Sequence, residues 1–414
     1  MKRYKVAIVS DFYFPQVGGL EVHMHDLAHE LTLRGHEPHV ICATPGGPNK
    51  EIFPVIRLDV PLMPIVKSIR NTETLPVLER ALRAGGYDLV HAHNVFSPMA
   101  HAAAYLARKL DIPSVFTLHS VLRGAGSLVF RLIDQFCPWT QWPTVLTGVS
   151  SFVAEDLRAV SGRPDVHVLL NAVRTENWGE SLCGGGAVGD TARELRVVSV
   201  LRFTKRKRPL DLIRMIPEVY KRLPESLRPK FTLIGDGPER PRVEREIRRL
   251  NLTAHVELTG LLPRAEIRKI LARSAIFALP SYLEALPIAV LEARASGLPV
   301  VARTPNGVAE IIEHGKHGLL AKNTEEFIDA LVLLSKEPAL RAQMAAAAPR
   351  NLEHFTWDRC IASHERIYAL AMESHFQGRL PNPAFRRKSV HLSPLQPNPL
   401  PPPMPIPRIG GQDM

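Results

Sequence analysis

Short apolar runs alternate with amphipathic helical patterns along most of this chain, and this alternation restricts the possible folds. The first run is Val6–Ser10, and a helical pattern from Leu20 to Arg34 follows it. Strands separated by helices form parallel sheets that are covered by helices on both faces. Further strands are expected at Pro38–Cys42, Val55–Val60, Leu89–His93, Ser114–His119, Val145–Val149 and Val166–Leu170, with helices that include Leu75–Ala84 and Pro98–Leu110.

The same alternation restarts in the second half, which predicts two doubly wound α/β domains. Residues 179–192 lie between the halves, are rich in glycine and lack periodicity, as is typical of a flexible linker. The second set of expected strands comprises Arg196–Leu201, Lys230–Gly235, Val256–Gly260, Ala275–Leu279 and Pro299–Ala302. A length of 414 residues is sufficient for two full-sized cores.

The end of the chain differs in composition from the rest. A last helical pattern covers residues 357–377, and the proline-rich residues 378–414 predict disorder or polyproline II structure. We therefore expect a first domain (1–178), a linker (179–192), a second domain (193–356), a helix that crosses back to the first domain (357–377) and a tail (378–414).

The net charge of +11 is concentrated in one stretch. Residues 193–273 hold 21 Lys and Arg against 10 Asp and Glu, whereas the rest of the chain holds 31 of each class. This excess points to an anionic partner such as a diphosphate, an acidic lipid surface or nucleic acid. Phe203 is the only aromatic residue near the basic run Lys205–Arg208, which disfavours nucleic acid.

The spacing of the cysteines and the length of the apolar runs indicate the cellular location of the protein. The four cysteines form no CxxC pair, which favours reduced thiols and a cytoplasmic protein. No run approaches the ~18 apolar residues that a membrane-spanning helix needs.

Glu284 and Glu292 occupy a strand–loop–helix–strand stretch between residues 275 and 302. Pro287 is placed to open the helix, and Gly297 to end it. Loops at the carboxyl edge of a parallel sheet bind ligands in α/β folds, so the two carboxylates are candidates for accepting hydrogen bonds from sugar hydroxyls. The alternative is that both are solvated acids at the start of a helix.

Three further loops lie at the ends of expected strands. Gly18 and Gly19 precede the first helix, where adjacent glycines allow close approach of a phosphate or simply form a tight turn. Arg202 and Lys207 follow one strand of the second domain, and Gly235 ends another. The two cations suit a diphosphate, and the alternative is a solvated basic loop.

Three histidines lie at the ends of neighbouring expected strands. His91 and His93 alternate on one strand and therefore project to the same face, and His119 ends the next strand. Such a group could bind a metal, but no acidic or cysteine ligand accompanies it. Hydrogen bonding to a polar substrate is therefore favoured, and no metal is expected.

The joint order of these motifs resembles the family 4 glycosyltransferases of the GT-B fold (glycosyl transferases group 1). The resemblance spans roughly residues 5–375. It is carried by the Gly18-Gly19-x-Glu21 loop, His119, Asn171, Arg202 with Lys207, Gly235-Asp236-Gly237-Pro238, and Glu284-x7-Glu292. The first half is also similar to the catalytic subunit of phosphatidylinositol N-acetylglucosaminyltransferase, through Ser10-Asp11-Phe12, His91-x-His93 and Phe116-Thr117-x-His119-Ser120. Leu201 and Asn306 stand where the family often has glycine.

The resemblance implies two Rossmann-like domains facing each other across a cleft, and it implies residue roles. Arg202 and Lys207 would hold the diphosphate of a UDP- or GDP-sugar, Glu292 the ribose, and Glu284 the donor sugar, with His119 beside that sugar. The implied catalytic residues are His119, Glu284, Arg202 and Lys207; the implied donor-binding residues also include Gly18, Gly19, Gly235, Ala285, Leu286, Pro287 and Glu292; the implied acceptor residues are Glu21, His23, His91 and His93.

The expected reaction is the transfer of a hexosyl unit with retention of configuration, without a cofactor or metal. The acceptor is expected to be lipid-linked, a polyol or a glycan. Residues 61–70 and 121–142 mix apolar residues and cations, and the second stretch also holds Trp139 and Trp142. This mixture suits peripheral docking on the anionic inner face of a membrane or, alternatively, packing in the core. Two other functions remain open, a nucleotide-sugar epimerase on the same fold and a non-catalytic basic binding module.

Overall fold

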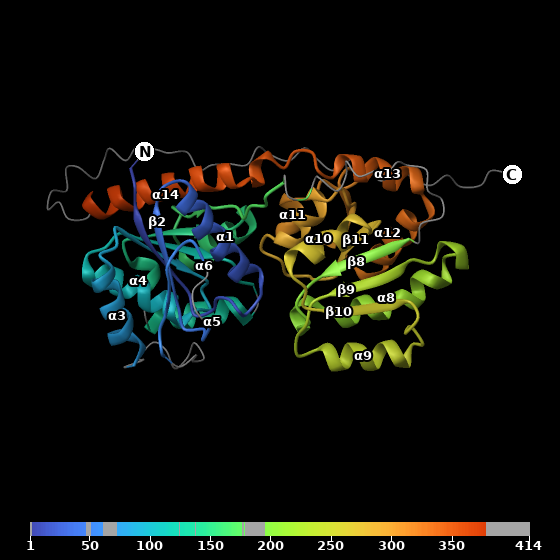
Figure 1. Ribbon diagram of the computed structural model, residues 1–414, viewed down its shortest axis with the longest axis horizontal. Helices are drawn as coiled ribbons and strands as arrows, with labels where there is room; N and C mark the ends of the chain where they lie inside the picture. Colours follow the sequence, from blue (N-terminus) through green and yellow to red (C-terminus); the bar gives the residue numbers. More distant parts are fainter. Residues whose placement is uncertain are drawn as a thin grey trace. The chain divides into compact units, whose positions relative to one another are not determined.

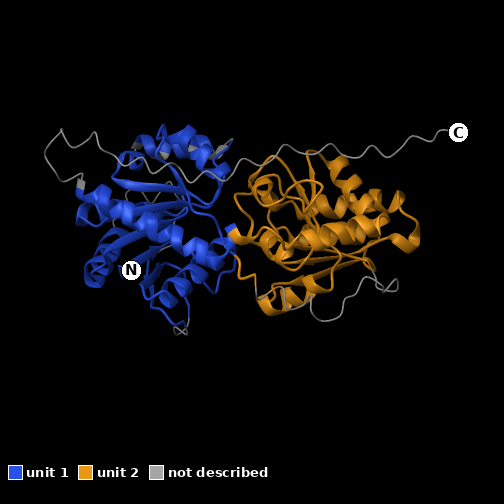
Figure 2. Ribbon diagram, turned by 90° about the horizontal axis from the view of Figure 1, so that it is seen from above, with its two compact units in different colours: residues 1–172, 354–397 blue, residues 173–353, 398–414 orange. Residues whose placement is uncertain are grey.

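The computed structural model describes residues 2–46, 51–60, 73–123, 125–136, 138–175, 178 and 195–377. The chain divides into two compact units, which are coloured separately in Figure 2. Of the described residues, unit 1 holds those up to 172 together with 354–377, and unit 2 holds those from 173 to 353. The linker expected at 179–192, the tail at 378–414 and the apolar segment 61–70 lie outside the described residues.

Unit 1 contains a seven-stranded parallel sheet in the order β3-β2-β1-β4-β5-β6-β7. Its strands are β1 (Lys5–Val9), β2 (Glu37–Cys42), β3 (Val55–Arg57), β4 (Leu89–His93), β5 (Ser114–Leu118), β6 (Thr144–Gly148) and β7 (His167–Val168). Its helices are α1 (Gly19–Leu33), α3 (Thr74–Gly85), α4 (Pro98–Leu110), α5 (Ala125–Phe136), α6 (Ser151–Ser161) and α14 (Trp357–Gln377). The predicted α/β class and the predicted strands are confirmed, although β3 and β7 are shorter than expected. Both are edge strands that pair on one side only.

The helix α14 belongs to unit 1, and Figure 1 shows it beside α1. Trp357, Ile361 and Tyr368 share one apolar cluster with Met24 and Leu27 of α1. Polar contacts add to this packing, because Arg34 donates to Asp358 over 2.6 Å and a ring nitrogen of His36 lies 3.1 Å from Glu365. The last described helix therefore packs in the same unit as the first strand and the first helix of the chain.

Unit 2 contains a six-stranded parallel sheet in the order β10-β9-β8-β11-β12-β13. Its strands are β8 (Arg196–Val200), β9 (Lys230–Ile234), β10 (Val256–Gly260), β11 (Ile276–Leu279), β12 (Val300–Arg303) and β13 (Gly318–Ala321). Its helices are α8 (Pro209–Lys221), α9 (Arg240–Arg249), α10 (Arg264–Ala272), α11 (Ile288–Ala295), α12 (Thr324–Lys336) and α13 (Pro338–Ala347). The sequence did not indicate β13, which has four residues and begins with glycine.

Because both sheets are parallel, the loops that follow neighbouring strands lie together at the carboxyl edge of each sheet. The strands β8, β11 and β12 are neighbours in unit 2, so the loops that leave them meet at one edge. In unit 1 the neighbours β4 and β5 bring the segments after His93 and Leu118 together in the same way. No helix within the described part of the chain is long and apolar enough to cross a membrane.

Candidate active site

In unit 2, the loops that follow β8 and β9 are joined by backbone hydrogen bonds, and Arg202 lies at the surface. Leu201 N–H donates to Ile234 O over 3.0 Å, and Phe203 N–H donates to Asp236 O over 2.8 Å. Gly235 has φ +137°, and a Cβ there would lie 2.0 Å from Leu201 O, so only glycine fits. Arg202 is exposed between two buried neighbours and makes no ion pair with the described residues.

Lys207 and Glu284 form a partly buried ion pair at the same edge of the sheet. Lys207 follows β8, Glu284 follows β11, and Lys207 Nζ donates to both carboxylate oxygens over 2.7 Å. The Glu284 side chain is only 4% exposed. The alternative of a solvated acid is therefore wrong for Glu284. A carboxylate that is fixed in this way is preorganised for a ligand that also contacts Lys207.

Asn306 and Gly307 support the loop that carries Glu284. Asn306 Nδ2 donates to Tyr282 O over 3.3 Å, and Gly307 N–H donates to Glu284 O over 2.9 Å. A Cβ at Gly307 would lie 1.6 Å from Ala285 O. The carboxamide oxygen of Asn306 also accepts from Val308 N–H over 2.9 Å. Asn306, which stands where the family often has glycine, therefore joins its own turn to the loop that carries Glu284.

Glu292 lies in α11 and is paired with a residue that sequence reasoning missed. The side chain of Glu292 is 8% exposed and accepts from Arg264 Nε over 2.9 Å. Arg264 begins α10, and its guanidinium carbon lies 5.9 Å from the ring centroid of Trp178. Glu292 is therefore not a solvated helix-start acid either. Of the loop before α11, Ala285 and Leu286 are buried, and Pro287 is the N-cap residue.

In unit 1, the first loop and its glycines begin α1. Gly18 is the N-cap residue, and a Cβ there would lie 2.5 Å from a carboxylate oxygen of Glu21. A Cβ at Gly19 would meet nothing within 4 Å. Glu21 itself is 5% exposed. A side chain at position 18 would require the end of the Glu21 side chain to shift, whereas the open space beside Gly19 is compatible with a ligand.

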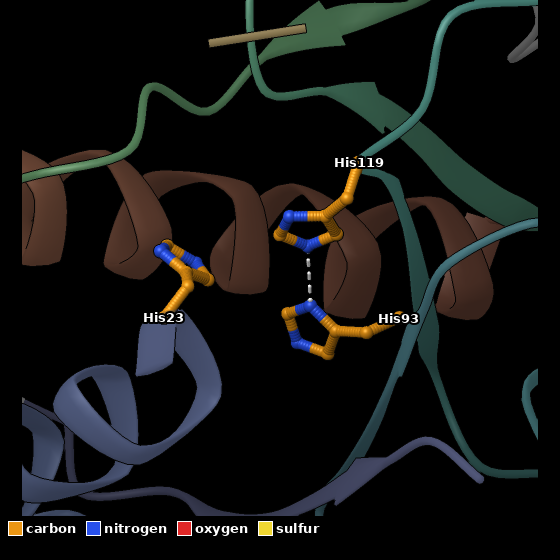
Figure 3. A group of neighbouring side chains, drawn as sticks. All are labelled: His23, His93 and His119. Atoms are coloured by element: carbon orange, nitrogen blue, oxygen red, sulfur yellow. Dashed lines mark hydrogen bonds between the residues drawn. The ribbon is translucent and has the colours of Figure 1, made fainter. Parts of the chain in front are cut away.

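Four histidines of unit 1, His91 and His93 of β4, His119 after β5 and His23 of α1, gather in one largely buried group. His93 Nδ1 lies 2.9 Å from His119 Nε2, and the His23 ring centroid lies 5.1 Å from that of His119 (Figure 3). His91 lies on the same face of β4 as His93, as predicted. Both of its ring nitrogens are engaged, one by Tyr368 OH at 2.9 Å and one by Thr117 Oγ1 at 2.6 Å.

Burial keeps these imidazoles neutral. It lowers the pKa of His23, His91 and His93 well below the usual value, and neighbouring imidazoles contribute to the same effect. Burial lowers the pKa of His119 to about 3. Neutral rings offer one donor and one acceptor each, so the group can bind hydroxyls of an uncharged ligand.

The tryptophans of the segment 121–142 correct one expectation. Trp139 is fully buried and stacks on Phe116, with ring centroids 4.8 Å apart, and Trp142 is 5% exposed. They belong to the core and are not available to a membrane surface. In contrast, Leu128 and Leu132 of α5 are 62% and 47% exposed.

Two family models match this chain, one on each half. The model described as Glycosyltransferase Family 4 matches residues 17–177, and the model described as Glycosyl transferases group 1 matches residues 189–351. The two matches lie on the two α/β units.

Similar proteins agree with this assignment. One subunit of the phosphatidylinositol N-acetylglucosaminyltransferase of Arabidopsis thaliana is 28% identical over 380 residues, which cover 90% of this chain and 83% of that protein. Alpha-monoglucosyldiacylglycerol synthase of Acholeplasma laidlawii is 24% identical over 387 residues, which cover 88% and 96%.

Solved structures share the fold. HepE of Anabaena in complex with UDP and glucose has a TM-score of 0.70 at 19% identity, over 89% of this chain and 99% of that chain. Sucrose-phosphate synthase of Thermosynechococcus elongatus has a TM-score of 0.72 at 17% identity, over 90% and 100%. This chain belongs to the family 4 glycosyltransferases (glycosyl transferases group 1) of the GT-B fold, with two Rossmann-like domains.

Proposed function

We propose that this glycosyltransferase moves a hexosyl unit from a UDP- or GDP-sugar to a lipid-linked acceptor, with retention of anomeric configuration. The observation that carries the proposal is the Lys207–Glu284 pair, which lies with exposed Arg202 at the carboxyl edge of the second sheet. Two cations and an immobilised carboxylate at one edge suit a ligand that joins a diphosphate to a sugar. Similarity to proteins named for transfer to phosphatidylinositol and to a diacylglycerol derivative supports a lipid acceptor.

The proposed roles follow the charge that develops during transfer. Negative charge grows on the departing diphosphate, where Arg202 and Lys207 stabilise it. Glu284 accepts hydrogen bonds from the donor sugar, and Glu292 accepts them from the ribose. Gly235 permits close backbone approach, and His119, in unit 1, is assigned to binding of a sugar hydroxyl. The acceptor binds near His23, His93 and Glu21.

Because cations of the protein neutralise the diphosphate, we propose that transfer needs no divalent metal or cofactor. The leaving diphosphate assists deprotonation of the acceptor on the same face, which accounts for retention without a nucleophilic carboxylate. Addition of Mg²⁺ or of EDTA should leave the rate nearly unchanged.

The two alternative functions fit the side chains less well. An epimerase needs carboxylates that exchange protons with the sugar, whereas Glu284 and Glu292 are each held by a cation. A basic binding module needs free cations, but many arginines of α8 and α9 are paired. Arg214 and Arg249, for example, both bind Glu246 and lower its pKa to about 2.

Nucleotide-sugar binding to the full chain tests the proposal directly. Thermal unfolding should be followed with UDP-, GDP- and ADP-sugars. A donor at 100 times its Kd adds ~2.7 kcal/mol of stability. We expect a clear shift with one UDP- or GDP-sugar, and the absence of a shift with every nucleotide sugar would overturn the proposal.

Glu292→Ala should raise the KM for the donor about 10- to 100-fold with a smaller effect on kcat, because the lost contact to ribose is present before and during transfer. Steady-state kinetics measure both parameters. Glu266→Ala is the matched control, since Glu266 lies on neighbouring α10, is 47% exposed and pairs with Lys269. Equal effects of the two substitutions would refute the ribose assignment.

The exposed side of α5 is the proposed membrane contact. Leu128 and Leu132 lie one turn apart and are the most exposed described apolar residues of this helix, and Arg131 between them is also exposed. Apolar residues with an adjacent cation suit a helix that lies on an anionic bilayer. This placement would bring unit 1 to the surface that holds a lipid acceptor.

Replacing both Leu128 and Leu132 by Asp should lower the affinity for vesicles of phosphatidylserine or phosphatidylinositol about tenfold or more, since burial of one leucine contributes roughly 1.5–3 kcal/mol. Flotation at low salt measures the effect. Leu33→Asp is the control, because Leu33 is 66% exposed at the end of α1. If the wild-type protein ignores anionic vesicles at every salt concentration, a soluble acceptor becomes the better proposal.

A further inference from the structure

Three histidines of unit 1 offer a set of nitrogen ligands. His23 from α1, His93 from β4 and His119 after β5 each supply one ring nitrogen, and these three atoms lie within 4.8 Å of one another. Figure 3 shows the rings of His93 and His119 facing each other, with the ring of His23 beside them. Two different strands and a helix thus converge on one small volume.

Two nitrogens of this group are buried without a hydrogen-bond partner among the described residues. They are His23 Nδ1 and His93 Nε2. Buried polar atoms are satisfied in the large majority of cases, so two such atoms on adjacent rings point to a ligand that binds here.

The chemistry of the donors selects the class of ion. Neutral imidazole is a common ligand of Zn²⁺ and of other borderline transition metals, whereas Mg²⁺ prefers oxygen ligands. Bonds of about 2.0–2.1 Å to a tetrahedral zinc place two ligand nitrogens about 3.3 Å apart. His93 Nδ1 and His119 Nε2 lie 2.9 Å apart and share a hydrogen bond, so ligation by His93 through its unpartnered Nε2 requires rotation of the His93 ring.

We infer that His23, His93 and His119 bind a borderline transition-metal ion such as Zn²⁺, with solvent or a substrate oxygen as a fourth ligand. This site is not a cofactor site for transfer. Because the proposed acceptor uses the same side chains, the ion should compete with it. That consequence, unlike binding itself, rests on the proposed function.

Metal binding by a second pair of histidines must be distinguished from binding by this group. His25 and His29 lie one turn apart on α1, their ring centroids are 6.4 Å apart, and both are partly exposed. Residues one helical turn apart can chelate a metal at a surface. The variant His29→Ala removes that pair and leaves the buried group intact.

Binding of Co²⁺ and Zn²⁺ to the chelator-treated full chain, without substrates, tests the site. We expect one Zn²⁺ per chain in competition with a chromophoric chelator, and the intense visible absorption of four-coordinate Co²⁺. Both should persist in His29→Ala, and Zn²⁺ affinity should fall at least 100-fold in His93→Gln and in His23→Gln. His101→Gln is the control for removal of a buried histidine outside the group.

Three results would overturn the metal site, and a fourth would overturn only the proposed placement of the acceptor. Absence of stoichiometric binding, loss of binding in His29→Ala, or unchanged binding in both His93→Gln and His23→Gln would overturn the inference. The Co²⁺ spectrum of the wild-type protein decides the matter even if a variant does not fold. Zn²⁺ that binds at this site but leaves the acceptor KM unchanged would support the metal site and overturn the proposed placement of the acceptor.

Discussion

Lys207→Ala should lower kcat/KM for the nucleotide-sugar donor about 100- to 1,000-fold, because it removes a preorganised charge from the leaving diphosphate. Steady-state kinetics with the donor identified by thermal shift measure the effect. Lys205→Ala is the matched control, since Lys205 lies in the same short 3₁₀ turn and is exposed. We expect the control to stay within about twofold of wild type, as surface substitutions have small effects.

The same substitution also leaves Glu284 buried without its counter-ion, which costs roughly 3–5 kcal/mol when a buried pair is broken. Loss of stability must therefore be separated from loss of catalysis. Adding Glu284→Gln to Lys207→Ala should restore much of the free energy of unfolding but not the activity. A Lys207→Ala protein with wild-type kcat/KM would show that the diphosphate binds elsewhere.

Gly307→Ala should lower kcat about 100-fold, because displacement of a positioning element by about 1 Å has effects of this size. A Cβ at this position would lie 1.6 Å from Ala285 O, so the loop that carries Glu284 must move. Overpacking should also reduce the free energy of unfolding by roughly 1–3 kcal/mol. Donor turnover and thermal unfolding are measured on the same preparation.

Gly315→Ala separates steric displacement from backbone strain. Gly315 has φ +82°, which disfavours alanine, yet a Cβ there would meet nothing within 4 Å. This variant should lose some stability and keep its activity. If Gly307→Ala retains the wild-type kcat, the Asn306–Gly307 turn does not set the position of Glu284.

Local patterns were enough to predict most of the fold. Interior strands of a parallel sheet are buried on both faces, so β1, β4 and β5 are short, mostly apolar runs that the sequence pattern reveals. The short strand β13 carries too few residues for such a signal. It forms because it pairs with β12, and at Gly318 a Cβ would lie 2.0 Å from Val300 O.

The candidate site was only partly predictable. Arg202, Lys207, Glu284 and Glu292 could be selected as candidates because each lies in the loop or the helix that follows a strand. The support from Arg264 and Asn306 depends on contacts across the sheet edge that no local pattern contains. The same limit explains the error at Trp139 and Trp142, because a mixture of aromatic and basic residues does not reveal which face a ring occupies.

We propose that the chain transfers a sugar from a nucleoside diphosphate sugar with retention of configuration. The most direct measurement incubates the full chain with the α-linked UDP- or GDP-sugar that stabilises it and with vesicles that contain phosphatidylinositol or diacylglycerol. Proton NMR then reads the coupling of the anomeric proton in the product. We predict release of the nucleoside diphosphate in step with an α-linked glycolipid. A β-linked product would contradict retention, and an epimerised nucleotide sugar without release of the diphosphate would contradict the transfer itself.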